Sequence, residues 1–364
     1  MRRLLIILPA ILVLSPVAKT VAQEAVYLGS RREAVHVTTR AQYQRYVDGD
    51  ARIEELTFPL SAFVPVTPEL GLSLRASPAR ASGRALESVG SVSDAQIGAT
   101  YSKGFRRTSL VLGLSANLPV GKTSLSAREF DTSRRLSQNF YDFYLPIFGQ
   151  GLNVAQSLTL AVPIHERIVV GAGAAYQIKG PFTPSSAFPD EYDPGDELLL
   201  TAGLDVQISS SSALSGDLTV TTYAGDTVSD EVVFGSGNRF TLTAQLLQYV
   251  GRDELRLIAR YRSKGRSELP AVDGTVTKGE RTVPNQAELS GRYRLRLDEN
   301  TTVALLGHGR YYSAAGAFGS KSLVDVGVAP EHALSSTILL LTRFAYTTGS
   351  FSGVSAGAGL AFTL

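Results

Sequence analysis

The sequence contains no cysteine, only four histidines, and no long apolar run after its N-terminus. Without cysteine the chain can form no disulfide, thiolate metal site, cysteine nucleophile or lipoprotein anchor. A hydrophobic content of 44% with 19% charged residues excludes a disordered chain. No later segment approaches the roughly 20 apolar residues that a membrane-spanning helix needs. Any membrane crossing must therefore use β-strands.

The N-terminus has the three parts of an export signal. Arg2 and Arg3 precede an apolar core at 4–17, and the small residues Thr20 and Ala22 are placed for cleavage. A single anchoring helix is the alternative, but the core is shorter than the roughly 17 residues of a span. We expect residues 1–22 to be a removed signal peptide and residues 23–364 to form one outer-membrane β-barrel.

The charge balance excludes one class of partner. Removing residues 1–22 leaves 32 basic against 33 acidic residues. A nucleic-acid-binding surface would need a clear basic excess or patch. We therefore expect no nucleic-acid partner.

Beyond residue 30 the chain is a succession of about sixteen segments in which apolar and polar residues alternate. In "ELRLIARYRSKG", residues 254–265, charged residues occupy most even positions and apolar residues the odd ones. The segments run to about 10–13 residues, whereas the mean strand of a soluble protein has about 5–6. Since side chains alternate across a strand, each segment has one face suited to hydrocarbon and one suited to water.

The connections between these segments alternate in length. Every even connection is short, and several odd ones are long and rich in Ser, Pro, Gly and Asp: 77–91, 120–151, 179–195, 225–236 and 265–283. Short periplasmic turns and long external loops are typical of membrane barrels. The pattern predicts an all-β, transmembrane antiparallel barrel of the outer-membrane type with about 16 strands, or alternatively 14. A secreted soluble β-protein is the competing interpretation.

No motif indicates an enzyme, a cofactor or a metal site. The fragment "PVGKTSLS" resembles the end of a phosphate-binding loop, but the first glycine of that pattern is replaced by Ala116. The histidines, His36, His165, His308 and His332, are too dispersed to show a metal spacing or a catalytic triad. We expect no catalytic residue, no cofactor and no metal ion.

Charged residues on one parity of three consecutive segments form the most specific feature. We expect them to line the lumen as one cationic wall, because neighbouring strands lie about 4.8 Å apart. Either they form ion pairs with Asp205, Asp217 or Asp325, or they favour anions in a pore. The set comprises Glu254, Arg256, Arg260, Arg262, Glu288, Arg292, Arg294, Arg296 and Arg310.

The stretch "NFYDFYLPIF", residues 139–148, is too aromatic for a solvated loop. We expect it to fold inward or to cover the mouth of the barrel. Two roles remain open: structural packing against the barrel wall, or binding of a hydrophobic ligand. The aromatic residues are Phe140, Tyr141, Phe143, Tyr144 and Phe148.

The segments "SDAQIGATYSKGFRRTSLVLGLSANLPVGKTSL" and "LNVAQSLTLAVPIHERIVVGAGAAYQIKG" resemble the FadL-like outer-membrane transporters of phenol-degradation and hydrocarbon-uptake type. The resemblance implies diffusion of hydrophobic or aromatic compounds across the outer membrane. The chain departs from that family in having no room for a long N-terminal hatch and in its higher strand count. The residues that carry the resemblance are Asp94, Gly98, Tyr101, Leu118, Pro119, Gly121, Gly149 and Gly151.

The function predicted from these features is passive transport of small, hydrophobic or aromatic compounds by an outer-membrane barrel. A porin-type channel with an anion-favouring lumen and a structural or adhesive barrel without transport are the alternatives. The expected partners are outer-membrane lipid, the small-molecule solute and the barrel-assembly machinery. That machinery would recognise the final segment "GAGLAFTL", which resembles its signal although Leu364 replaces the usual final aromatic residue.

Overall fold

The computed structural model describes residues 34–364 except 139, 188–189, 271–275, 280 and 317. The predicted signal peptide at residues 1–22 lies outside the described residues. Within the described part of the chain, no helix is long and apolar enough to cross a membrane.

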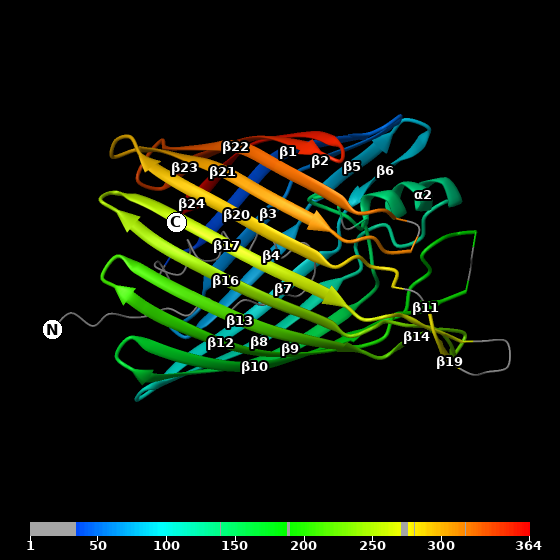
Figure 1. Cartoon of the computed structure of the whole chain (residues 1–364), viewed down its shortest axis with the longest axis horizontal. Coiled ribbons are helices and arrows are strands. Elements are labelled where there is room, and N and C mark those ends of the chain that lie inside the picture. Colours follow the sequence, from blue (N-terminus) through cyan, green and yellow to red (C-terminus); the bar gives the residue numbers. More distant parts are fainter. Residues whose placement is uncertain (1–33, 139, 188–189, 271–275, 280, 317) are drawn as a thin grey trace.

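Sixteen antiparallel strands form a closed barrel (Figure 1), as predicted, so the alternative of fourteen strands is wrong. The first strand closes the barrel by pairing with the last, from His36 opposite Thr363 to Val47 opposite Ser352. Thirteen of the strands are single elements: β1 (His36–Asp48), β8 (Thr108–Leu118), β9 (Asn153–His165), β10 (Ile168–Lys179), β12 (Glu197–Ser209), β13 (Ser212–Tyr223), β16 (Arg239–Val250), β17 (Asp253–Lys264), β20 (Gln286–Arg296), β21 (Thr301–Tyr312), β22 (Lys321–Ala333), β23 (Ile338–Gly349) and β24 (Ser352–Thr363).

The remaining three barrel strands are each made of two elements separated by a short irregularity. The second strand combines β2 (Ala51–Thr57) with β3 (Leu60–Pro65), and both elements pair with β1. The third combines β4 (Leu70–Ala76) with β5 (Pro78–Gly83), and the fourth combines β6 (Leu86–Val92) with β7 (Ala95–Phe105).

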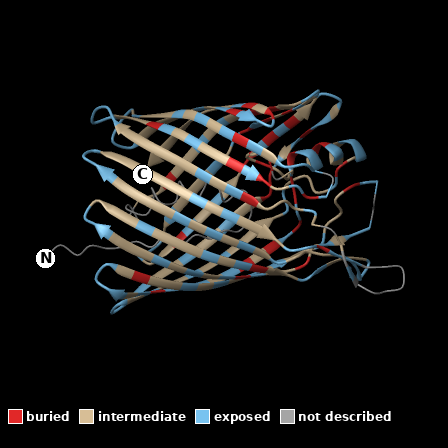
Figure 2. Cartoon of the chain, in the orientation of Figure 1, coloured by how far each residue is buried: buried red, intermediate tan, exposed pale blue. Residues whose placement is uncertain are grey.

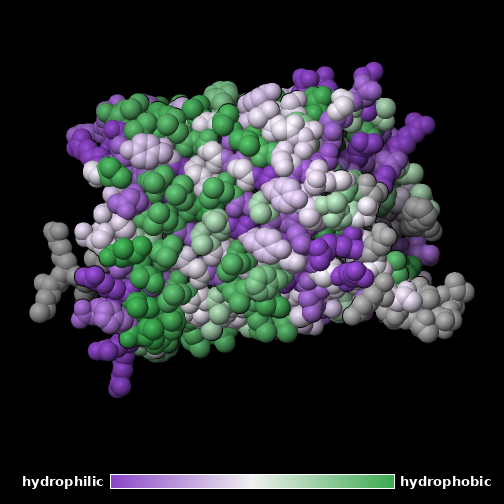
Figure 3. Space-filling model, in the orientation of Figure 1, coloured by the Kyte–Doolittle hydropathy of each residue, from purple (hydrophilic) through white to green (hydrophobic). Residues whose placement is uncertain are grey.

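The apolar parity of the strands lies on the outside of the barrel. Tyr261 of β17 and Leu289 of β20 are 42% and 60% exposed. Figure 2 shows exposed and less exposed residues alternating along the strands, and Figure 3 shows hydrophobic side chains over the middle of the visible wall with hydrophilic ones toward both ends. An apolar band flanked by polar rims is the surface that a bilayer requires of a barrel.

The two ends of the barrel differ. The turn end carries only short connections, together with the start of β1 and the end of β24, and the loop end carries the long ones as well as the short turns after β1, β5 and β23. Three of the predicted loops, 179–195, 225–236 and 265–283, contribute strands to a small five-stranded sheet at the loop end (Figure 1). Its elements are β11 (Tyr192–Asp193), β14 (Gly225–Val228), β15 (Glu231–Gly235), β18 (Glu268–Pro270) and β19 (Val276–Lys278).

The predicted loop at 77–91 is wrong, because this segment is the β5–β6 hairpin, which lengthens the barrel wall. A two-residue turn, Arg84–Ala85, joins the strands, and Ala85 has a φ of 61°. The inward residues Ala81 and Val89 are fully buried. The alternation of small apolar and polar residues therefore continues through this segment, and the hairpin has a buried face.

The longest connection, residues 119–152, contains helix α2 (Ala127–Leu136). Ser126 and Glu129 form a capping box that satisfies backbone N–H groups at the start of the helix. On the face of the helix that contacts the β5–β6 hairpin, the Thr132 hydroxyl donates to the carbonyl of Glu87 at 2.7 Å, and Leu136 is buried. The helix is thereby fixed on the β5–β6 hairpin at the loop end.

Candidate functional site

The residues of the predicted arginine wall lie on one parity of β17, β20 and β21, opposite the exposed apolar residues, and nearly all of the arginines are paired. Nearest the turn end, the Arg256 guanidinium lies 3.2 Å from the Glu254 carboxylate. Arg296 is exposed at that end, and its backbone N–H donates to Asp253 at 3.0 Å.

Two carboxylates hold the part of the wall nearer the loop end. Glu288 lies 3.5 Å from the guanidinium of Arg260 and 3.6 Å from that of Arg262. Asp325 lies 2.9 Å from the guanidinium of Arg310 and 3.3 Å from the imidazole of His308. These guanidinium groups can stay charged inside the barrel because each has a carboxylate partner.

Glu331 of β22 is a partner that the sequence did not reveal. Its two carboxylate oxygens each lie 2.7 Å from a guanidinium, that of Arg292 on one side and Arg294 on the other. Of the three acids considered from sequence, only Asp325 forms an ion pair in the described part of the chain. Asp142 of the long connection also acts electrostatically on Arg310, so the seven predicted arginines face five carboxylates: Glu254, Glu288, Asp325, Glu331 and Asp142.

The aromatic segment, defined here as residues 140–148, folds inward and lies against the inner wall. Asn139, the first residue of the predicted stretch, is outside the described residues. Three wall side chains hold the segment through its backbone: Gln44 accepts from the N–H of Tyr144 at 2.7 Å, Glu55 accepts from the N–H of Leu145 at 3.1 Å, and Arg310 donates to the carbonyl of Phe140 at 3.3 Å.

The rings of the aromatic segment are packed together and against the wall. The Tyr46 ring of β1 lies 5.4 Å from the Tyr141 ring and 5.0 Å from the Phe143 ring, measured between centroids. Phe140, Tyr141, Phe143 and Phe148 are all buried, and Tyr144 is partly buried against them. Ring contacts at these distances stabilise a packed cluster. Ligand binding by this segment stays a prediction.

Asp94 fixes both ends of the long connection. One carboxylate oxygen accepts from the N–H of Gly121 at 2.9 Å, and the other accepts from the N–H of Gln150 and the side-chain amide of Asn117, both at 2.8 Å. A Cβ at Gly121 would lie 2.1 Å from the carbonyl oxygen of Phe148. The sequence singled out Asp94 and Gly121 only through the family resemblance. In the structure, their role is the hydrogen bond between the Gly121 N–H and the Asp94 carboxylate.

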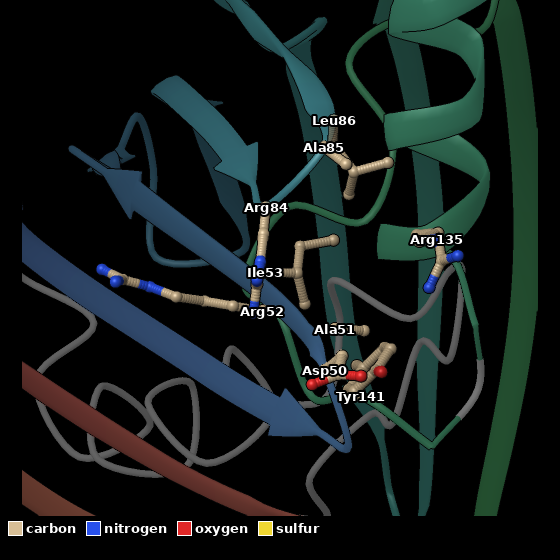
Figure 4. A pocket seen from close by; sticks show the side chains of 9 residues that line it. All are labelled: Asp50, Ala51, Arg52, Ile53, Arg84, Ala85, Leu86, Arg135 and Tyr141. Atoms are coloured by element: carbon tan, nitrogen blue, oxygen red, sulfur yellow. The ribbon is translucent and has the colours of Figure 1, made fainter.

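A pocket of about 430 Å³ lies at the loop end, between the β1–β2 turn, the β5–β6 hairpin and α2 (Figure 4). In Figure 4 the Arg52 side chain extends away from α2, whereas Arg135 projects from the helix. Arg52 is paired with Glu54 at 2.7 Å and is substantially exposed, so the pocket belongs to the rim of the barrel. Its lining residues are Asp50, Ala51, Arg52, Ile53, Arg84, Ala85, Leu86, Arg135 and Tyr141.

No protein-family model and no curated protein matches the chain. Among solved structures it is similar to the CymD monoaromatic hydrocarbon channel, with 12% identity and a TM-score of 0.44 over 96% of this chain and 91% of that one. It is also similar to OpdQ from Pseudomonas aeruginosa, with 10% identity and a TM-score of 0.39 over 91% and 98%. The translocator domain of the autotransporter NalP from Neisseria meningitidis matches with 7% identity and a TM-score of 0.35 over 94% and 97%. Similarity this distant assigns no substrate.

Proposed function

We propose that this chain is an outer-membrane channel for passive transport of small solutes, with a preference for anions. A barrel of sixteen strands encloses more space than its inward side chains fill, as in porins. The apolar outer band and the export signal expected at residues 1–22 support a Gram-negative-type outer membrane as its location.

The anion preference rests on one observation, the excess of arginine on the inner face of β17, β20 and β21. Seven arginines face five carboxylates there, counting Asp142 beside Arg310. Rings of like charge in a pore favour permeation of ions of the opposite sign. Pairing with a carboxylate weakens the electric field of each arginine, but the arginines still outnumber the carboxylates.

The position of the aromatic segment favours a lumen that is narrowed rather than closed. It is held by wall residues of β1, β2 and β21. In the order of the sixteen strands, β13 is the ninth and stands across the lumen from β1. A solute would pass between the aromatic segment and the wall around β13, and the arginine wall would flank its route.

Transport of hydrophobic or aromatic compounds is the second candidate. The Phe318 ring is 40% exposed at the loop end and lies 5.7 Å from the Phe140 ring of the buried cluster. An apolar solute could meet this ring before it reaches the barrel. In this case, removing the Phe318 ring with Phe318→Ala would reduce hydrocarbon uptake by cells and leave ion selectivity unchanged.

The experiment that tests the proposed function is a reversal-potential measurement on the refolded mature protein in a planar bilayer under a salt gradient. Folding is checked first by gel migration, because a folded outer-membrane barrel migrates anomalously until it is boiled. We expect a steady current with a reversal potential of the sign for anion preference. Cation preference would contradict the role of the arginine wall, and silence from a folded barrel would favour transport of hydrophobic compounds or a structural or adhesive role.

A further inference from the structure

A second group of cations surrounds Tyr223 at the loop end, next to the predicted arginine wall. The ammonium of Lys264 lies 4.9 Å from the centroid of the Tyr223 ring, that of Lys179 lies 5.9 Å away, and the guanidinium of Arg239 lies 5.8 Å away. We call these four residues, together with Glu197, the Tyr223 cluster.

Strand register explains how residues so distant in sequence come together. Glu197 of β12 is directly opposite Tyr223 of β13, and Arg239 of β16 is directly opposite Lys264 of β17. Their neighbours Leu198 and Phe240 are exposed on the outer surface. The cluster residues therefore point toward the lumen from five neighbouring strands, β10 to β17.

The cluster has more positive than negative charge. Glu197 is its one carboxylate, lying 2.7 Å from the Lys179 ammonium and 3.9 Å from the Arg239 guanidinium. In the described part of the chain, no carboxylate lies within ion-pair distance of Lys264. Asp226 affects Lys264 electrostatically, but its carboxylate accepts hydrogen bonds from the Tyr192 hydroxyl and the Gly195 N–H. The cluster itself therefore has three cations for one carboxylate, and the charge of the nearby Asp226 offsets part of this excess.

We propose that the Tyr223 cluster is a binding site for small organic carboxylates, with dicarboxylates preferred. Three cations gathered on one ring repel each other, and an anion with two carboxylates would neutralise the excess charge. Arginine binds carboxylates through parallel N–H donors, and lysine binds them as a point charge. The Tyr223 ring holds the cations together through cation–π attraction.

The position of the cluster suits the first contact of an incoming solute. Tyr223 ends β13, across the lumen from the wall that holds the aromatic segment. From Lys264, the inner face of β17 continues toward the turn end with Arg262 and Arg260. An anion released by the cluster would therefore meet the arginine wall next. The inference rests on the proposed function to the extent that it names the solute that enters the barrel.

The test is equilibrium dialysis of radiolabelled succinate against the refolded mature barrel in detergent, with uncharged succinamide as the matched ligand. The Lys264→Met variant removes the cation without a carboxylate partner, and Lys264→Arg restores the charge. Lys103→Met is the matched control, because Lys103 is an exposed lysine beside the β7–β8 turn at the other end of the barrel. Folding of each variant is verified by heat-modifiable migration.

We expect Lys264→Met to weaken succinate binding about 10-fold or more, and Lys264→Arg and Lys103→Met to change it less than about 3-fold. We also expect binding to weaken as salt is raised. Equal binding of succinamide, or unchanged binding by a folded Lys264→Met variant, would overturn the proposal. Dialysis does not require conduction, so binding by a silent barrel would contradict only the channel, and conduction without binding would contradict only this site.

Discussion

The Asp94 carboxylate holds both ends of the long connection at 119–152. We expect Asp94→Ala, which removes this carboxylate, to release both ends. The substitution removes three acceptor contacts, to the N–H groups of Gly121 and Gln150 and to the Asn117 side chain. The barrel strands do not depend on these contacts. We therefore expect local opening of the connection in an otherwise folded barrel.

The magnitude follows from the three hydrogen bonds. Bonds to a charged group contribute about 1.5–3 kcal/mol each, and burial of the freed N–H groups adds a desolvation cost. Water can replace some of these contacts at the loop end, so we expect opening to become easier by about 2–4 kcal/mol. Since every 1.4 kcal/mol is a factor of ten, the open population should rise at least about 30-fold.

Trypsin cleavage measures this opening, because α2 contains Arg128, Arg134 and Arg135. When opening is fast relative to cleavage, the cleavage rate follows the open population. The control is Asp131→Ala, since the Asp131 side chain is 60% exposed and makes only a 3.4 Å contact with Arg134. An exposed pair of this kind contributes little. Equal cleavage rates for folded Asp94→Ala and for the control would refute the role of Asp94.

Three further predictions address the connection and the arginine wall. Gly121→Ala should also accelerate cleavage, because its Cβ would lie 2.1 Å from the Phe148 carbonyl oxygen, and a rate equal to that of the wild type would contradict this contact. Burial raises the pKa of Glu129, but the Lys122 ammonium and the hydrogen bonds with Ser126 lower it by more, so the pKa lies below its ordinary value of 4.5. The Glu129 contribution to α2 is therefore present above about pH 4.5 and lost as the pH falls through the lowered pKa, so amide protection in α2 should fall there in the wild type and not in Glu129→Gln. Glu331→Gln leaves two arginines without their carboxylate and should shift the reversal potential further toward anion preference; an opposite shift would contradict the account.

The strand count was predictable because alternation is a local property of the sequence. The alternation of apolar and polar residues can be recognised in each long segment without reference to the others. The pairing of β1 with β24 that closes the barrel requires no further sequence signal. The 77–91 segment was misread as a loop because its turn residues and its small inward side chains, Ala79 and Ala81, weaken the contrast between the two faces. Its hairpin becomes evident once β6 is seen to bury Val89 beneath α2.

Side-chain partners were less predictable, because they depend on register between strands. Thr243 of β16 lies between Asp217 of β13 and Arg260 of β17, which puts two strand spacings, about 10 Å, between that acid and that arginine. Glu331 reaches the arginines of β20 across β21, and only the register of β20, β21 and β22 reveals this. The Tyr223 cluster likewise requires five strands to be aligned before its cations meet.

The central claim is that an anion-favouring passage runs between the aromatic segment and the opposite wall. Its most direct test compares single-channel conductance of the wild type with that of a variant in which residues 140–145 are replaced by a Gly-Ser linker of equal length. We predict an anion-selective current in the wild type and a larger one in the variant, because the segment narrows the mouth. Equal conductance in the two folded proteins would contradict this placement of the passage.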